Sequence, residues 1–328
     1  MRSRRPQVHD HDCRIGTGFC RGLSVTIPSL FSLSNLRQGY KIRHEGTELS
    51  LVFPSVLSEV RFNFEQLGLP STSVGPTSSE FDSLGRGPYT SISDGRIVRY
   101  DGPNVGFVDF AFSSPNRSPR VCDGTNDPNL GHICGRSLGI RFYLKTGELF
   151  IADAYRGLVV AGPGGGLATT IATSAEGQTF KFVDGVDVDP FSGHVYFTDA
   201  SSRFSLSQMS EAIAAGDKTG RLLKYNPSTK QVTVLLKGLA GAAGVAVSSN
   251  STYVLVTEFL AKRVRKLWLS GPKANTSEVV VTLKEGRIRL GGSILGRNTT
   301  VSEFNERDSR YYLGSLQADF LGVLDFLV

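Results

Sequence analysis

Residues 147–162 read GELFIADAYRGLVVAG, and this stretch contains the pattern that decides the fold. A glycine turn precedes a short apolar strand, an acidic residue, a second turn and a second strand, which is typical of a β-hairpin. Four other segments repeat this order at steps of 47 to 61 residues, with matching strand positions at Tyr89, Phe150, Phe197, Leu255 and Leu313. Repeats of this kind are the signature of a β-propeller, whose small sheets pack face to face around an axis. The sequence therefore predicts an all-β propeller rather than a β-sandwich of unrelated hairpins.

The composition fits a globular protein without membrane-spanning segments. Of the 328 residues, 40% are hydrophobic and 20% are charged, which is the ordinary range for a folded domain. No apolar run approaches the roughly 18–20 residues that cross a bilayer, so the chain is not expected to be an integral membrane protein. The net charge is +6, and residues 1–45 account for +5 of it, with eight basic and three acidic side chains. The rest of the chain is nearly neutral, which argues against a nucleic-acid partner.

The chain divides into a predicted leader and a predicted propeller domain. Residues 1–65 form a basic leader that is either poorly ordered or an incorrectly assigned start, and the propeller occupies residues 66–328. A basic start and an apolar stretch at 23–36 are typical of a secretory signal, although a proline interrupts the stretch. The Arg- and Ser-rich composition also fits an organelle transit peptide, against which Asp10 and Asp12 count. Both destinations remain open.

Two cysteines, Cys122 and Cys134, enclose a polar loop that is rich in turn residues. They form either a disulfide, which would stabilise the fold by about 2–3 kcal/mol, or two buried thiols. A disulfide is favoured in an oxidising compartment, and three good sequon matches support passage through one, with a fourth at Asn116 that is weaker because Pro119 follows it. The sequon asparagines are Asn116, Asn250, Asn275 and Asn298. We therefore expect a glycoprotein of the secretory pathway, in the vacuole or outside the cell.

Four longer blocks of sequence point to a family. They are FDSLGRGPYTSISDGRIVRYDG (81–102), CGRSLGIRFYLKTGELFIADAYRGLVVAGPGGGLAT (134–169), GDKTGRLLKYNPSTKQVTVLLKGLA (216–240) and LWLSGPKANTSEV (267–279). These blocks resemble the plant strictosidine synthase-like family, whose members are six-bladed propellers distantly related to paraoxonases and regucalcin-type lactonases. The resemblance covers roughly residues 65–328 and implies a disulfide between Cys122 and Cys134. It also implies a small-molecule site in the central channel.

The resemblance implies one of two chemistries in that channel. The family's synthases condense tryptamine with secologanin in alkaloid biosynthesis, and the hydrolytic relatives cleave lactones and phosphotriesters with a channel calcium ion. Calcium requires six to eight oxygen ligands. Here Thr77 replaces the first acidic ligand of the relatives, Gly185 stands where the second acid would be and leaves Asp184 as a candidate ligand, and Ala243 replaces an asparagine. We therefore expect no calcium cofactor.

The catalytic glutamate of the synthases is also replaced, because its position corresponds to Ser302. Glu303 is the next residue, but successive side chains of a strand point to opposite faces, so it is expected to face away from the channel. A serine hydroxyl is too weak a base to take over unaided. Glu258 is the other strand carboxylate to test, although packing at the core rim explains it equally well.

The propeller is also short for six blades. Residues 65–328 number 264, whereas six blades of roughly 45–50 residues need about 270–300. The deficit falls around Lys284–Leu295, which predicts a truncated blade. The acids Asp187 and Asp189 could form a catalytic pair, but the end of a strand at a turn is the favoured interpretation.

These features together predict a strictosidine synthase-like propeller whose synthase or hydrolase activity is impaired or altered. The first alternative is a non-catalytic binding propeller that has lost its chemistry. The second is a true strictosidine synthase.

Overall fold

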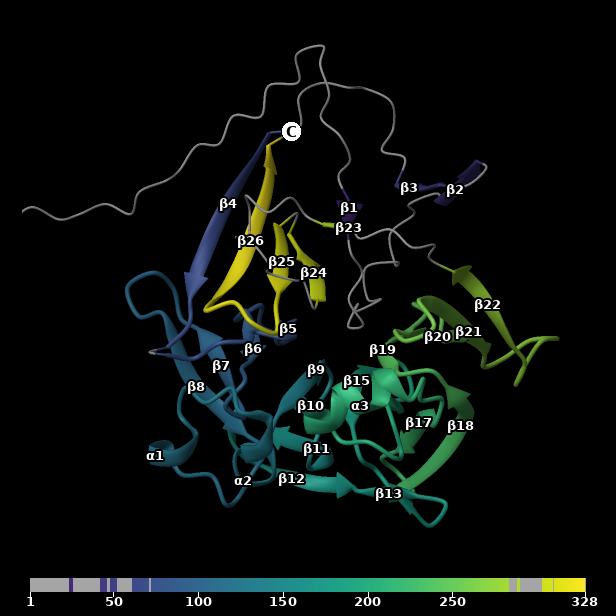
Figure 1. Ribbon diagram of the computed structural model, residues 1–328. Coiled ribbons are helices and arrows are strands. Elements are labelled where there is room, and N and C mark those ends of the chain that lie inside the picture. The colour runs from purple at the N-terminus through teal and green to yellow at the C-terminus, as the bar shows by residue number, and fades with distance from the viewer. Residues whose placement is uncertain are drawn as a thin grey trace, which may run out of the picture.

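The computed structural model describes residues 24–25, 42–45, 48–51, 61–70, 72–282, 288–289, 303–308 and 310–327. Ser302 and Asn298 lie outside these residues. Strands dominate the described part, and most of them form five antiparallel four-stranded blades, the first two of which are joined into one eight-stranded sheet by a parallel strand pair. Figure 1 shows the five blades arranged around a common axis, with the first strand of each blade nearest to the axis. The predicted all-β propeller is therefore confirmed.

The first four blades follow one another along the chain, each with its strands in sequence order. The first contains β5 (Ser79–Glu80), β6 (Tyr89–Ser91), β7 (Arg96–Tyr100) and β8 (Phe107–Phe112). The second contains β9 (Ser137–Tyr143), β10 (Glu148–Asp153), β11 (Gly157–Gly162) and β12 (Gly165–Ala172). The third contains β15 (Val183–Val188), β16 (Val195–Asp199), β17 (Gly220–Asn226) and β18 (Gln231–Leu239). The fourth contains β19 (Ala242–Val247), β20 (Tyr253–Glu258), β21 (Arg263–Trp268) and β22 (Ser277–Thr282).

The last sheet joins the two ends of the propeller. It contains β24 (Glu303–Arg307), β25 (Arg310–Gly314), β26 (Phe320–Leu327) and β4 (Arg61–Gly68). Strand β4 pairs with β26 along its whole length, from Gly68 opposite Phe320 to Arg61 opposite Leu327. A strand from before the first blade thus completes the last one, and the predicted boundary at residue 65 falls within that strand. All five matching positions of the sequence repeat lie on second strands: β6, β10, β16, β20 and β25.

The arc between β22 and β24 is the short part of the ring. It contains 20 residues, 283–302, whereas the fourth sheet alone uses the 41 residues from 242 to 282. The described residues of this arc form β23 (Ile288–Arg289), which pairs with β1 (Ser24–Val25). A further hairpin joins β2 (Ile42–Glu45) to β3 (Glu48–Leu51). Twenty residues are too few for a sheet like its neighbours, in agreement with the predicted truncated blade.

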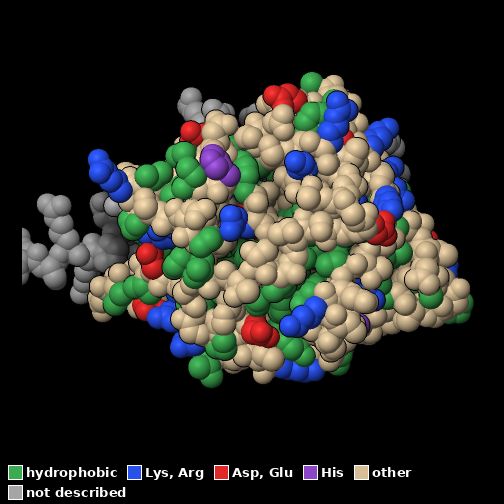
Figure 2. All heavy atoms as spheres, turned by 90° about the horizontal axis from the view of Figure 1, so that it is seen from below, with side chains coloured by type: hydrophobic (Ala, Val, Ile, Leu, Met, Phe, Trp, Pro, Cys, Tyr) green, Lys and Arg blue, Asp and Glu red, His purple; other side chains and the backbone are tan. Residues whose placement is uncertain are grey.

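The remaining elements are short and lie in loops. They are α1 (Pro119–Cys122), η2 (Pro128–Leu130), α2 (Gly131–Cys134), the hairpin β13 (Ser174–Ala175) and β14 (Gln178–Thr179), η3 (Leu206–Gln208) and α3 (Met209–Ala214). Among the described residues, no helix is long and apolar enough to cross a membrane. On the face seen in Figure 2, Lys and Arg side chains lie singly among hydrophobic, neutral and acidic ones.

The hydrophobic core lies between neighbouring sheets. Tyr89 of the first sheet is fully buried and packs edge-on against Phe142 of the second, with ring centroids 4.9 Å apart. Phe150 of the second sheet and Phe197 of the third share the next cluster. Each contact buries a large aromatic side chain, which contributes about 1.5–3 kcal/mol. The alternating apolar residues of the hairpin repeat thus hold successive blades together.

Glycines let the first strands approach closely around the axis. A Cβ atom on Gly139 of β9 would lie 2.7 Å from the carbonyl oxygen of Asp184, and one on Gly185 of β15 would lie 2.5 Å from that of Ala243. Such separations are far below van der Waals contact, so these positions require glycine. The pairing registers of β15 and β19 also shift here, before Val186 and Val245. A bulge of this kind changes which side chains face the channel.

Candidate functional site

A narrow cavity lies on the axis between the first strands of the first four blades. Its volume is about 40 Å³, and its lining includes Thr77, Leu138, Asp184 and Gly244. At roughly 10–15 Å³ for each water molecule, this space holds a few waters or one small ion. An organic ligand must therefore bind at an open end of the channel rather than inside the cavity.

Asp184 is the most unusual side chain in the lining. Its residue is 2% exposed, and its Oδ1 atom is buried without a hydrogen-bond partner among the described residues. Burial raises the pKa of Asp184 well above the ordinary value of 3.8. Removing a charged carboxylate from water is costly unless it is paired. Burial therefore favours the uncharged form of this carboxyl group.

Equivalent positions in the first, second and fourth blades carry no acid. Leu138 and Ala243 each precede the close-approach glycine of their strand, as Asp184 does, and Thr77 takes this place in the first blade. The Thr77 hydroxyl lies 2.8 Å from Oγ of Ser91 and donates to the carbonyl oxygen of Ser137 at 3.2 Å. This ring of positions therefore offers one carboxyl group, from Asp184.

A calcium ion does not fit this donor set. Calcium needs six to eight oxygens, several of them from carboxylates. In the part of the chain that the structure describes, no three His, Cys, Asp or Glu residues are grouped as metal ligands. Gly185, where the hydrolytic relatives of the family are expected to carry an acid, has no side chain to offer.

The far end of the cavity is closed by an ion-pair cluster. Arg141 contacts Glu80 of the first blade, and its Nε lies 2.9 Å from Oδ1 of Asp187 in the third. Asp187 also accepts a hydrogen bond of 2.7 Å from the backbone N–H of Val247 in the fourth blade. Burial raises the pKa of Glu80, although Arg141 opposes the shift. The cluster ties four blades together around the axis.

The two acids at the end of β15 have different roles. Asp189 accepts hydrogen bonds from the backbone N–H of Phe191 and the hydroxyl of Ser192, at 2.9 and 2.5 Å, in the turn that follows the strand. This is the position at the end of a strand, next to a turn, that the sequence analysis favoured over a catalytic pair. Asp187 instead lines the channel and pairs with Arg141. The two acids therefore do not act as a catalytic pair.

Glu258 is held by arginines at the end of β20. It is fully buried, and its Oε1 lies 2.7 Å from Nε of Arg263 and 3.0 Å from Nε of Arg265. Burial alone would raise the pKa of Glu258, but the hydrogen bonds from Arg263, the Ala240 backbone and Arg265 lower it. The charged, paired carboxylate is not part of the cavity lining.

The same arrangement recurs at the ends of other second strands. Asp199, which ends β16, lies 2.6 Å from Nη2 of Arg221. Asp94, in the turn after β6, lies 2.6 Å from Nη2 of Arg96. The acidic position of the sequence repeat therefore forms an ion pair in the first, third and fourth blades, whereas Asp153 of the second blade accepts hydrogen bonds from the backbone N–H groups of Arg136 and Tyr155.

An apolar cluster lies at the end of the channel opposite the Arg141 ion-pair cluster. We call this end of the channel the mouth. The apolar cluster comprises Leu138, Ala154, Tyr155, Phe182, Ala200, Leu206, Met209 and Leu316. Leu138 also lines the cavity, so the mouth adjoins it. Apart from Leu138 of β9, these residues follow second strands or precede first strands of several blades, which is where a propeller collects its loops.

Arg136 lies beside the mouth and was missed by the sequence analysis. A Cβ atom on Gly75 would lie 3.2 Å from its Nη2 and 2.9 Å from the carbonyl oxygen of Leu316, so Arg136 extends toward the last blade. Its Nη1 is buried and has no hydrogen-bond partner among the described residues. Burial lowers the pKa of Arg136 to about 10. The one available signal was its place directly before a first strand.

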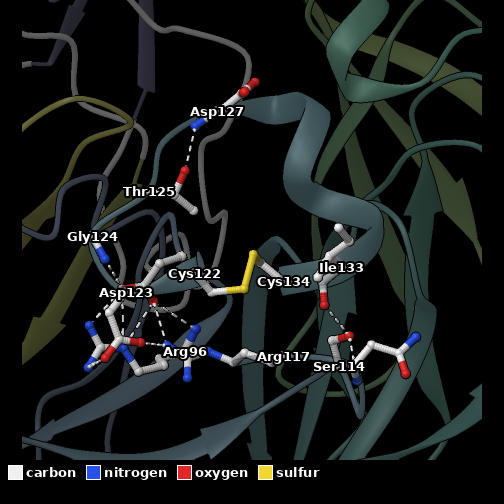
Figure 3. The surroundings of a disulfide bond; sticks show 12 residues. Arg96, Ser114, Arg117, Cys122, Asp123, Gly124, Thr125, Asp127, Ile133 and Cys134 are labelled. Atoms are coloured by element: carbon white, nitrogen blue, oxygen red, sulfur yellow. Dashed lines mark hydrogen bonds and ion pairs between the residues drawn. A yellow bond between two sulfur atoms is a disulfide. The ribbon is translucent and has the colours of Figure 1, made fainter. Parts of the chain in front are cut away.

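The loop before Arg136 is fixed by a disulfide. Cys122 and Cys134 are bonded, as the resemblance implied. Figure 3 shows the loop held against the first blade: the backbone N–H of Gly124 donates to Asp94 at 2.9 Å, and the Ser114 hydroxyl donates to the carbonyl oxygen of Ile133. Within the loop, Gly131 leaves room for the ring of Tyr155, which a Cβ atom would overlap. The loop therefore supports the mouth.

The other predicted site residues are placed as follows. Glu303 begins β24, and Ser302 is not described. The sequon residues Asn116, Asn250 and Asn275 are exposed, whereas Asn298 is not described. Their glycosylation stays a prediction.

Comparison with known proteins assigns the chain to a family. The family model for strictosidine synthase matches residues 184–272. Protein STRICTOSIDINE SYNTHASE-LIKE 12 of Arabidopsis thaliana is 40% identical over 319 residues, which cover 84% of this chain and 95% of that protein. The chain belongs to the strictosidine synthase-like family. Strictosidine synthase of Catharanthus roseus is 42% identical to this family member over 221 residues, covering 67% of this chain and 63% of the enzyme.

Solved structures agree on the fold of this strictosidine synthase-like chain. A gluconolactonase from Xanthomonas campestris superposes with a TM-score of 0.54 at 11% sequence identity, covering 83% of this chain and 91% of the other. At this identity the likeness concerns the fold alone.

Proposed function

We propose that this strictosidine synthase-like propeller binds a small organic molecule at the channel mouth and that its chemistry is altered or impaired relative to its family. The observation that carries the proposal is Asp184, a buried carboxyl group whose Oδ1 has no hydrogen-bond partner among the described residues and which is the one acid among the four equivalent channel positions. The apolar mouth supports it, because small-molecule sites are mainly apolar with a few placed polar groups. An alkaloid precursor, ester or lactone suits such a site.

The uncharged Asp184 would act as a hydrogen-bond donor rather than as a metal ligand. A desolvated carboxylic acid donates a hydrogen bond to a carbonyl or to water, whereas a carboxylate only accepts. Because the residue lines the cavity below Leu138, it would hold water or a ligand oxygen at the base of the mouth. No step of this proposal requires calcium.

The proposed compartment is the secretory pathway, ending in the vacuole or outside the cell. The disulfide supports it, since disulfides persist mainly in oxidising compartments. Glycosylation at the three exposed sequons would be consistent with it. An organelle transit peptide is the alternative.

Two measurements test the proposed function. An ion that binds the native state raises the thermal midpoint by mass action. Because the proposal includes no calcium site, the midpoint should stay unchanged across micromolar to millimolar calcium. Incubation with tryptamine and secologanin, followed by mass detection, should yield no condensed product. A calcium-dependent rise, or a product that Asp184→Asn abolishes, would contradict the proposal.

The alternative of a non-catalytic binding propeller predicts a different pattern. Ligand binding at the mouth would then occur without turnover of any ester or lactone. Turnover that is lost in Asp184→Asn, while binding is kept, would favour an enzyme over this alternative.

A further inference from the structure

Arg136 is half-buried and differs from three other buried or half-buried arginines of the blades in having no carboxylate within ion-pair distance. Arg96, Arg141 and Arg221 each lie within 3.0 Å of an aspartate. No ion pair or side-chain hydrogen bond joins the guanidinium of Arg136 to any described residue, and its Nη1 is buried. A guanidinium cannot escape this cost by losing its proton, since it stays charged in proteins. Asp153 and Asp94 attract this cation without forming an ion pair, so the buried Nη1 donor stays unmatched among the described residues.

The surroundings of Arg136 suit a ligand with an apolar body. Leu138 and Phe182 are buried in the mouth cluster, and Leu316 and Tyr155 pack against them. Gly75 has no side chain, which leaves room for Nη2 of Arg136 beside it. Burial in this setting strengthens electrostatic attraction, because fewer water molecules screen the charge. An anion that entered the mouth would find a partly desolvated cation beside an apolar wall.

We propose that Arg136 recognises the carboxylate of a small organic acid whose apolar body occupies the mouth. A guanidinium presents parallel N–H donors that match a carboxylate in a bidentate pair. This inference rests on the proposed function, because it names the class of ligand that the mouth takes. It also excludes a cationic amine such as tryptamine, since Arg136 would repel it.

Three ligands with one ring system test this inference. Indole-3-acetate carries a carboxylate, indole-3-acetamide is its uncharged analogue, and tryptamine carries an ammonium group. Calorimetric titration of the full chain should show indole-3-acetate binding at least about tenfold more tightly than the amide, as for charge-assisted hydrogen bonds, and tryptamine should bind most weakly.

Variants assign this preference to Arg136. Arg136→Gln should reduce the preference for acetate over amide to about twofold or less. Arg86→Gln is the matched control, because Arg86 is a half-exposed surface arginine paired with Asp82, and it should keep the wild-type preference. Equal binding of acetate and amide, or tightest binding of tryptamine, would overturn the inference and leave the proposed function standing. Binding of none of the three would overturn both.

Stability without ligand gives a second, independent test. Arg136→Met removes an unpaired buried charge, so it should raise the thermal midpoint by about 2–4 °C. Arg221→Met leaves Asp199 buried without its partner, so it should lower the midpoint. A lower midpoint for Arg136→Met would mean that Arg136 serves the fold, and it would overturn the inference.

Discussion

The acids at the ends of the second strands and the acid of the channel are equally buried but differently paired. Asp199 and Glu258 are each 0% exposed and contact arginines, whereas Asp184 is 2% exposed and has an unpartnered oxygen. Burial therefore does not separate structural acids from candidate site acids in this propeller. Pairing does, because an ion pair offsets desolvation and an unpaired carboxyl gives up its charge instead.

The largest effect is expected where a paired acid loses its charge. Asp199→Asn leaves Arg221 buried, with its side chain 4% exposed, opposite an uncharged amide. Breaking a buried pair in this way should lower the free energy of unfolding by about 3–5 kcal/mol. Urea unfolding at pH 7 would measure it. Retained stability would mean that the acids after the second strands do not hold the blades.

A smaller loss is expected when the loop beside the mouth is released. The double variant Cys122→Ser, Cys134→Ser removes a bond that spans 12 residues, and it should lower the free energy of unfolding by about 2–3 kcal/mol. Because the loop packs on Tyr155, indole-3-acetate should also bind more weakly. Wild-type protein treated with a thiol reductant provides a check, and unchanged unfolding in both samples would contradict the structural role of the loop.

The channel acid should respond to pH in the opposite sense to Glu258, whose pKa is lowered by its hydrogen bonds from Arg263, Ala240 and Arg265. The pKa of Asp184 is raised in the folded state, so the folded protein binds this proton more tightly than the unfolded chain does. The wild type therefore loses stability as pH rises from about 4 through the folded pKa. Asp184→Asn cannot ionise and should be more stable than the wild type at pH 7.5, by about 1–3 kcal/mol. The difference should vanish near pH 4, and a less stable variant at pH 7.5 would contradict the assignment.

The sequence revealed the fold more fully than the site. The hairpin repeat is local, so all five strand positions could be read from neighbouring residues, and all five are second strands. The role of Glu258 depends on Arg263 and Arg265 of the next strand, which a strand pattern alone does not bring together.

The channel was harder still to predict, because it is built from several blades at once. The expected alternation of side chains does not hold for β15 and β19, where the register shifts beside Gly185 and Gly244. Arg136 shows the same limit. Its lack of a partner follows from which residues of other blades surround it, and a linear sequence does not record that.

The protonation state of Asp184 tests the account most directly. Difference infrared spectra between the wild type and Asp184→Asn at pH 7 would report it through the carbonyl stretch of a protonated carboxyl group. We predict that this band is present in the wild type, absent in Asp184→Asn and retained in Glu258→Gln. A carboxylate signal from Asp184 at pH 7, with no protonated band, would contradict the distinction between paired structural acids and an unpaired channel acid.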